Sequence, residues 1–202
     1  MKKWGMVAAA AVLGLVVAMS GTANAQFVKG QFLVGPGAGA AIPMGDFGDA
    51  ADIGFGFGGV GDYMLTPNLA VGADFMYNML GAKVEEDLED VSVDDFKLLQ
   101  ITGHAKYFFG QDGAKMTPYL FGGAGFYNMK GGVSVDIGDI DLDVSASSTE
   151  FGVNGGAGML FKAGEKMKVG VQGAFHNVMT EGDATQYISA GAFLLFTFGA
   201  QQ

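Results

Sequence analysis

Apolar and polar side chains alternate along residues 98–109, which read LLQITGHAKYFF. From residue 99 onward, every second position is apolar or small: Leu99, Ile101, Gly103, Ala105 and Tyr107. The positions between them carry an amide, a hydroxyl, an imidazole and an ammonium group: Gln100, Thr102, His104 and Lys106. Successive side chains of a strand point to opposite faces. The pattern therefore predicts a strand with one apolar and one polar face.

The same alternation recurs in eight segments: 27–42, 53–65, 69–81, 96–109, 117–130, 150–162, 167–178 and 186–198. Their connections alternate between short turns and mostly longer, acidic loops, and the loops are 43–52, 82–95, 131–149 and 179–185. This arrangement is typical of a transmembrane β-barrel, because a sheet spans hydrocarbon only when it closes on itself. We predict an all-β, eight-stranded, antiparallel up-and-down barrel over 26–198, with a short periplasmic tail at 199–202.

Each strand of such a barrel turns one face to lipid and the other to the lumen. The last segment has a clear lipid face: Ile188, Ala190, Ala192, Leu194, Phe196 and Phe198. In 98–109 the polar set is expected to point inward, while Leu99, Ile101, Ala105 and Tyr107 face lipid. Segment 117–130 fits two registers, because Tyr119, Phe121 and Tyr127 compete with Leu120, Ala124 and Phe126, and its register stays open.

The N-terminus has the pattern of a secretory signal peptide. Lys2 and Lys3 precede an apolar run that ends near Met19, and residues 23–25 read Ala-Asn-Ala. These features predict Sec-dependent export and cleavage after Ala25, which removes residues 1–25. The alternative is a retained membrane anchor, for which the run is short.

Composition excludes several classes of protein. The formal net charge is −10, which becomes −12 when Lys2 and Lys3 are removed, and the chain has no Arg. Such an acidic chain is not expected to bind nucleic acid. It has no Cys, hence no disulfide and no lipidated cysteine. No later run of about 18 apolar residues would form a membrane-spanning helix.

A polar set is predicted to line the lumen: Asp62, Asp74, Gln100, His104, Lys106, Asn154, Lys168, Gln172 and His176. An eight-stranded barrel is just wide enough for its side chains to fill it. These groups are therefore expected to satisfy one another's charges and hydrogen bonds. A narrow path for water or ions and a catalytic dyad are the two alternatives.

The six tyrosines divide equally between the two predicted ends of the barrel. Tyr63, Tyr107 and Tyr119 lie near the predicted periplasmic turns. The other three lie near the predicted outer loops: Tyr77, Tyr127 and Tyr187. A phenol places its ring in the apolar layer and its hydroxyl among headgroups. This distribution predicts two interfacial aromatic girdles.

Two outer segments are rich in carboxylates. One reads VEEDLEDVSVDD at 84–95 and is a solvated loop or a site for divalent cations that bridge to lipopolysaccharide phosphates. In the other, acidic residues match positions 1, 3, 5 and 12 of a calcium loop: Asp139, Asp141, Asp143 and Glu150. Position six is Val144 where that loop requires Gly. Alternation over 133–144 instead favours a hairpin that turns at Gly138 and Asp139.

Several motifs together resemble the outer-membrane β-barrel family that includes the OmpA and OmpX type of eight-stranded barrel. They are the signal peptide, AIPMGDF at 41–47, GDYMLTPNL at 61–69, PYLFGGAG at 118–125 and the aromatic last strand. The resemblance covers 26–198 and implies insertion into a Gram-negative outer membrane by the barrel-assembly machinery. The resemblance extends to porin-family-type outer membrane proteins and does not fix a function, since one fold serves many functions. Phe198 is followed by four residues, a departure that leaves the assembly signal and the role of 199–202 open.

Enzymatic members of such families are not matched. The lipid A deacylase type carries a His-x-Ser pair, whereas His104 precedes Ala105-Lys106 and His176 precedes Asn177-Val178. The omptin type needs a His at the outer rim, and no His lies in a predicted outer loop. We expect a monomeric, non-enzymatic barrel without a cofactor. Its expected role is structural, supporting the envelope and presenting acidic loops to lipopolysaccharide and to a surface partner of unknown identity. The alternative is a narrow passive channel.

Overall fold

The computed structural model describes residues 27–83, 91–93, 95–109, 114–137, 140–180 and 184–199. The predicted signal peptide lies outside the described residues. The strands are β1 (Phe32–Met44), β2 (Gly54–Met64), β3 (Leu69–Leu80), β4 (Val91–Val93), β5 (Phe96–Phe108), β6 (Met116–Ile137), β7 (Ile140–Lys162), β8 (Met167–Val178) and β9 (Thr185–Phe198). One short helix, α2 (Asp46–Ala50), follows β1. Among the described residues, no helix has the length and apolarity needed to cross a membrane.

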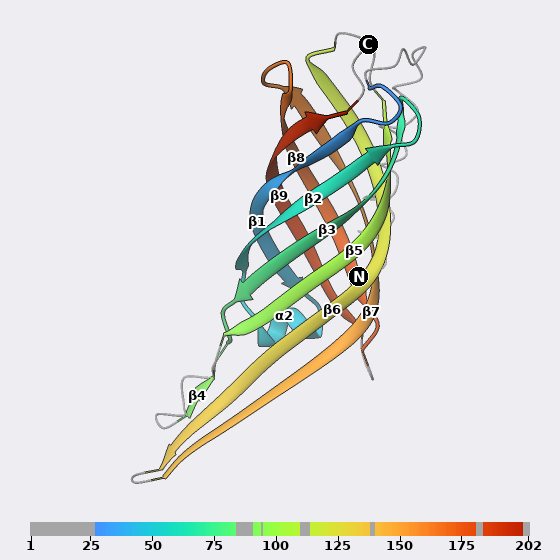
Figure 1. The fold of residues 1–202 in the computed structure, drawn as a ribbon. Helices are drawn as coiled ribbons and strands as arrows, with labels where there is room; N and C mark the ends of the chain where they lie inside the picture. Colours follow the sequence, from blue (N-terminus) through green and yellow to red (C-terminus); the bar gives the residue numbers. More distant parts are fainter. Residues whose placement is uncertain are drawn as a thin grey trace.

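Eight of these strands form the predicted closed, antiparallel barrel (Figure 1). The order is β6-β5-β3-β2-β1-β9-β8-β7, and pairing of β6 with β7 closes the ring. The first and last strands are neighbours, with Phe32 opposite Phe198. Their shared end also carries the turns 65–68 and 163–166, and we call it the turn end. The opposite end, which carries α2, β4 and the tip of the β6–β7 hairpin, is the loop end (Figure 1).

Side chains alternate between an apolar outer wall and a packed interior along each strand. The outer wall exposes large apolar groups, among them Phe55 at 70%, Phe126 at 61% and Ile101 at 52%. Exposed apolar area on this scale is not expected in water and suits a hydrocarbon surrounding. Leu99, Ala105 and Tyr107 lie on the same outward face as Ile101.

The structure differs from the predicted segments in the first strand and in three of the outer loops. β1 begins at Phe32 and not at residue 27, and the predicted loops 43–52 and 82–95 contain α2 and β4. The predicted hairpin over 133–144 is present, because β6 and β7 pair without interruption from Met116–Phe161 to Ile137–Ile140. The hairpin lengthens two barrel strands and is continuous with them (Figure 1).

The structure decides the open register of 117–130 and corrects the aromatic girdles. Between Thr117 and Tyr127 of β6 the odd-numbered positions point inward, and Leu120, Ala124 and Phe126 take the outer face. Three predicted girdle tyrosines are therefore buried inside the barrel: Tyr119 at 3% exposed, Tyr127 at 0% and Tyr187 at 0%. The prediction of girdles used only the position of each tyrosine along the barrel, which lies near an interface for all six. It did not consider which face of the strand each side chain occupies, and these three side chains lie on the inner face. Tyr63, Tyr77 and Tyr107 do lie on the outer wall.

The interior is built in three layers. An apolar cluster fills the turn end, with Phe27, Leu33, Met64, Phe108, Leu160 and Leu195 among its members. A second cluster fills the loop end and includes Leu80, Leu98, Tyr127, Val178 and Tyr187. Phe47 of α2 packs against this second cluster, and its ring lies 6.2 Å from that of Phe96. Polar side chains occupy the layer between the two clusters.

Candidate functional site

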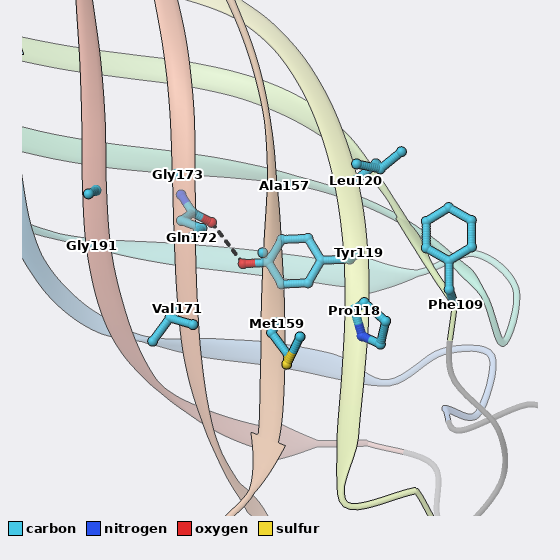
Figure 2. A pocket seen from close by; sticks show the side chains of 12 residues that line it. Phe109, Pro118, Tyr119, Leu120, Ala157, Met159, Val171, Gln172, Gly173 and Gly191 are labelled. Atoms are coloured by element: carbon cyan, nitrogen blue, oxygen red, sulfur yellow. Dashed lines mark hydrogen bonds between the residues drawn. The ribbon is translucent and has the colours of Figure 1, made fainter. Parts of the chain in front are cut away.

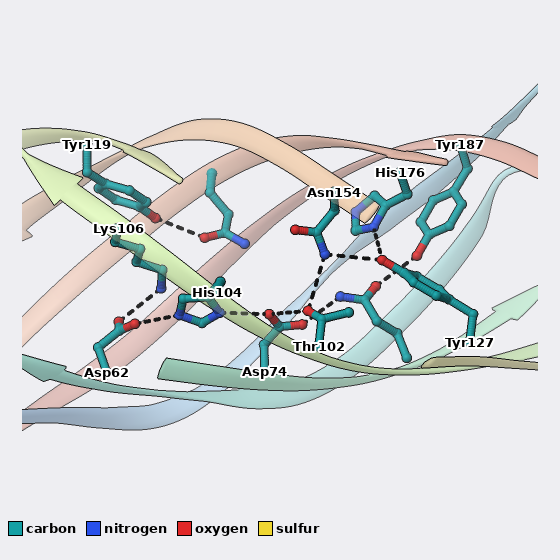
Figure 3. A network of polar contacts seen from close by, with 12 residues as sticks. Asp62, Asp74, Thr102, His104, Lys106, Tyr119, Tyr127, Asn154, His176 and Tyr187 are labelled. Atoms are coloured by element: carbon teal, nitrogen blue, oxygen red, sulfur yellow. Dashed lines mark hydrogen bonds and ion pairs between the residues drawn. The ribbon is translucent and has the colours of Figure 1, made fainter. Parts of the chain in front are cut away.

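The middle layer contains a chain of charged groups from three neighbouring strands (Figure 3). Lys106 Nζ lies 2.9 Å from Asp62 Oδ2, and His104 Nε2 lies 2.6 Å from Asp62 Oδ1. The other imidazole nitrogen, Nδ1, lies 3.0 Å from Asp74 Oδ1. Carboxylates only accept hydrogen bonds, so His104 satisfies both contacts as a doubly protonated imidazolium. The four charges then sum to zero, which suits a buried site.

Strand register explains why Asp62 and His104 meet. Gly72 pairs with Asp62 on one side and with His104 on the other. A Cβ at Gly72 would lie 2.7 Å from Asp62 Oδ1 and 2.8 Å from His104 Nε2. Asp62 and His104 can therefore contact each other only because the residue between them, Gly72, has no side chain.

Asp74 connects the charged groups to neutral polar groups. Its Oδ1 accepts a hydrogen bond from Thr102 Oγ1 at 2.7 Å, and its Oδ2 accepts one from Gln100 Nε2 at 2.6 Å. Tyr187 OH donates to Gln100 Oε1 at 2.8 Å, which ties this part of the network to the loop-end cluster.

A second branch crosses the lumen to β7 and β8. Asn154 Nδ2 donates to Thr102 Oγ1 at 3.2 Å and to Tyr127 OH at 3.1 Å. Tyr127 OH also lies 3.1 Å from His176 Nδ1. The His176 ring stacks on the Tyr187 ring with their centroids 4.2 Å apart.

The structure places all nine predicted lumen residues on the inner face. It brings seven of them into one connected network: Asp62, Asp74, Gln100, His104, Lys106, Asn154 and His176. Gln172 lies apart, where it accepts a hydrogen bond from Tyr119 OH at 3.0 Å. Lys168 lies near the turn end, with its Nζ 5.0 Å from the Phe27 ring. The sequence interpretation missed the three inward tyrosines, although strand alternation could have identified Tyr187.

The middle layer contains a small cavity. A cavity lined by Asp74, Asn154, His176 and their neighbours has a volume of about 30 Å³. This is room for about one or two water molecules. Asn154 is one of the residues that line the cavity. Its Oδ1 atom is buried and has no hydrogen-bond partner among the described residues. The cavity is therefore the size of a hydration site and much smaller than a solute pathway.

The calcium-loop interpretation of 139–150 is not supported by the backbone. Asp141 and Asp143 lie in β7 opposite Asp136 and Ser134, while Glu150 lies opposite Tyr127. An extended strand puts the Cα atoms of Asp143 and Glu150 about 24 Å apart, so the backbone of this segment does not have the shape of a calcium loop. Asp139 lies outside the described residues. The part of the chain that the structure describes contains no group of three or more His, Asp or Glu arranged to hold a metal ion.

The acidic segment 84–95 falls largely outside the described residues. Six of its seven carboxylates belong there: Glu85, Glu86, Asp87, Glu89, Asp90 and Asp94. Asp95 is described and exposed. Cation bridging to lipopolysaccharide by this segment stays a prediction.

Comparisons with known proteins agree with this architecture. The family model described as "Outer membrane protein beta-barrel domain" matches residues 8–195. Neisserial surface protein A is 21% identical with a TM-score of 0.56, and the match covers 84% of this chain and 100% of that one. No curated protein matches the chain.

Two further solved structures are similar in fold. The attachment invasion locus protein Ail of Yersinia pestis is 16% identical with a TM-score of 0.55, covering 84% of this chain and 100% of that one. OprG of Pseudomonas aeruginosa is 15% identical with a TM-score of 0.52, covering 88% and 99%. At these identities the likeness concerns the fold alone. The family match spans most of the sequence, and the chain therefore belongs to the outer membrane protein β-barrel domain family, whose members lie in the Gram-negative outer membrane.

Proposed function

We propose that this protein is a sealed, non-enzymatic barrel that anchors surface segments in the outer membrane and conducts no solute. The observation that carries the proposal is the filled interior, in which apolar clusters at both ends enclose a polar layer with a cavity of about 30 Å³. A porin-like path would need a continuous aqueous lumen, which larger barrels provide.

The energetics of the middle layer favour a permanent seal. Opening a path past His104 would separate it from Asp62 and Asp74, or separate Lys106 from Asp62. Leaving one member of such a buried pair without its partner costs about 3–5 kcal/mol. The network therefore acts as a polar core that holds β2, β3 and β5 together with β7 and β8.

The segments that such an anchor would present are at the loop end. The β5–β6 pairing ends at Lys97–Lys130, so β6 extends beyond it by the seven residues 131–137. At about 3.4 Å per residue, the hairpin projects about 24 Å. Short turns in this architecture are periplasmic and longer loops are extracellular. The hairpin and the acidic segment 84–95 thus face the cell exterior, where carboxylates can share divalent cations with lipopolysaccharide phosphates.

Single-channel conductance in a planar lipid bilayer tests the proposal. Folding of the mature protein is first checked by its heat-dependent gel shift. The folded protein is then expected to insert into the membrane without producing current steps. A trimeric porin, added to the same membrane as a control, should produce current steps. Steady openings that change in Lys106→Ala would refute the seal and establish a narrow channel whose path runs through the polar layer.

A further inference from the structure

The outer wall of the barrel contains a groove that crosses β6, β7, β8 and β9. Figure 2 shows its lining, which is mostly apolar and encloses a volume of about 510 Å³. This size lies within the range of small-ligand sites. We call it the wall groove. It runs from Phe109, next to the turn end, to Ala190, halfway along β9.

Consecutive small residues create the wall groove. Leu120 pairs with Ala157, Ala157 with Gly173 and Gly173 with Ala190, so that three small outward positions follow one large side chain. Met159 and Val171 form the neighbouring row, and Val171 is 41% exposed. At the bottom of the groove the Tyr119 ring lies directly beneath the backbone of Gly158 in β7. A Cβ at Gly158 would lie 2.3 Å from this ring, so there is no room for a side chain.

Two polar atoms beneath the floor of the groove are paired with each other. Tyr119 OH donates to Gln172 Oε1 (Figure 2), so the hydroxyl and the amide oxygen do not require a polar ligand in the groove. The groove also opens onto the wall that faces hydrocarbon. Its occupant must therefore be apolar along the length of the groove.

Positive charge gathers where the wall groove reaches the turn end. Lys115 precedes β6, Lys162 ends β7 and Lys166 lies in the following turn, and all three are exposed. The backbone holds two of them together, since Lys162 N donates to Lys115 O at 3.0 Å. The same turn contains one carboxylate, Glu165. In a chain of net charge −10, these described residues carry a local excess of two positive charges, which fits an anionic partner at the level of the periplasmic headgroups.

We propose that the wall groove binds one acyl chain of an anionic phospholipid from the periplasmic leaflet. The chain lies along Ala157 and Gly173, and the headgroup phosphate lies over Lys115, Lys162 and Lys166. A free phosphate would use the lysines and leave the groove unfilled. A neutral lipid would fill the groove and leave the lysines without a counter-charge. This site does not depend on whether the lumen is sealed.

Native mass spectrometry of the mature protein in detergent, with phosphatidylglycerol added, tests the site. The expected result is one retained lipid, held more strongly than phosphatidylcholine with the same chains. Gly173→Leu fills the groove, since a Cβ there has its nearest contact at 3.7 Å, and is expected to weaken retention about tenfold. Gly103→Leu is the matched control, because Gly103 is also an outward glycine, with its nearest contact at 3.8 Å, and does not line the groove. It is expected to retain the lipid.

Three results would overturn the proposal. Wild-type protein could retain no lipid, or Gly173→Leu could retain as much as Gly103→Leu. A dimer that Gly173→Leu abolishes would assign the groove to a second copy of the chain. The headgroup position is tested by Lys115→Gln and Lys166→Gln together, which should remove the preference for phosphatidylglycerol over phosphatidylcholine. An unchanged preference would refute it.

Discussion

Asp62 and Lys106 form an ion pair inside the barrel, with Lys106 Nζ 2.9 Å from Asp62 Oδ2 and both side chains no more than 5% exposed. Lys106→Met is expected to lower the free energy of unfolding by about 3–5 kcal/mol, because Asp62 would keep its buried charge with only His104 beside it. Urea titration in phospholipid vesicles measures the change. Circular dichroism is the suitable signal, since residues 26–202 contain no Trp.

The double variant Asp62→Leu/Lys106→Met is the control for this pair. It removes both charges and leaves His104 with Asp74, so the loss should be smaller than that of Lys106→Met alone. Equal losses in the two variants would mean that packing of the lysine stem, and not the ion pair, stabilises this layer.

Gly72→Ala should disturb the same layer through the backbone. The added Cβ would lie 2.1 Å from Gly61 O as well as against Asp62 and His104. We expect a loss of about 1–3 kcal/mol, typical of overpacking. Gly61→Ala is the matched control, because its Cβ would meet only Val34, at 3.9 Å, and its urea midpoint should be nearly that of wild type. A normal midpoint for Gly72→Ala would contradict the close packing of Asp62 and His104.

Tyr127→Phe tests the second branch of the network. It removes the hydroxyl that Asn154 Nδ2 and His176 Nδ1 share and leaves the ring in place. Unsatisfied buried groups should then lower the free energy of unfolding by about 1–3 kcal/mol. Tyr77→Phe, on the outer wall, is expected to have little effect. If the two variants were equally stable, Tyr127 would serve only as an apolar filler.

The projecting hairpin should be dispensable for the barrel. Replacing residues 132–145 by Asn-Gly joins Gly131 to Ala146 with a turn suited to paired strands. In the described part of the chain, β4 is the only strand besides β6 and β7 that pairs with the removed segment. The urea midpoint and the heat-dependent gel shift should therefore match those of wild type. Failure to fold would mean that the hairpin contributes to barrel assembly.

Alternation of polar and apolar side chains, together with the lengths of the connections, was enough to predict the fold, and alternation predicted the inward set of charges. On β5, apolar and polar residues alternate regularly, so Ile101 could be assigned to the outer face and Gln100 to the inner face without ambiguity. On β6 both faces carry aromatic and apolar groups, and the choice depended on partners in other strands. Tyr119 lies inside because Gly158 makes room for its ring and Gln172 accepts from its hydroxyl.

Other features had no local signal in the sequence. The helix α2 is five residues long, contains Gly48 and is held by contacts such as that of Phe47 with Phe96. The wall groove arises from the alignment of Ala157, Gly173 and Ala190 on three strands. Register between strands far apart in the chain decides such alignments, and the spacing within one strand does not reveal it.

The pairing of β1 with β9 has a consequence for biogenesis. Phe32 and Phe198 are almost a whole chain apart in sequence, and the ring stays open until the last strand arrives. Contacts between such distant segments form slowly. Until then β1 keeps an unpaired edge, which is prone to aggregation. We therefore expect the stage before β9 pairs with β1 to be the one at which the chain is most prone to aggregation.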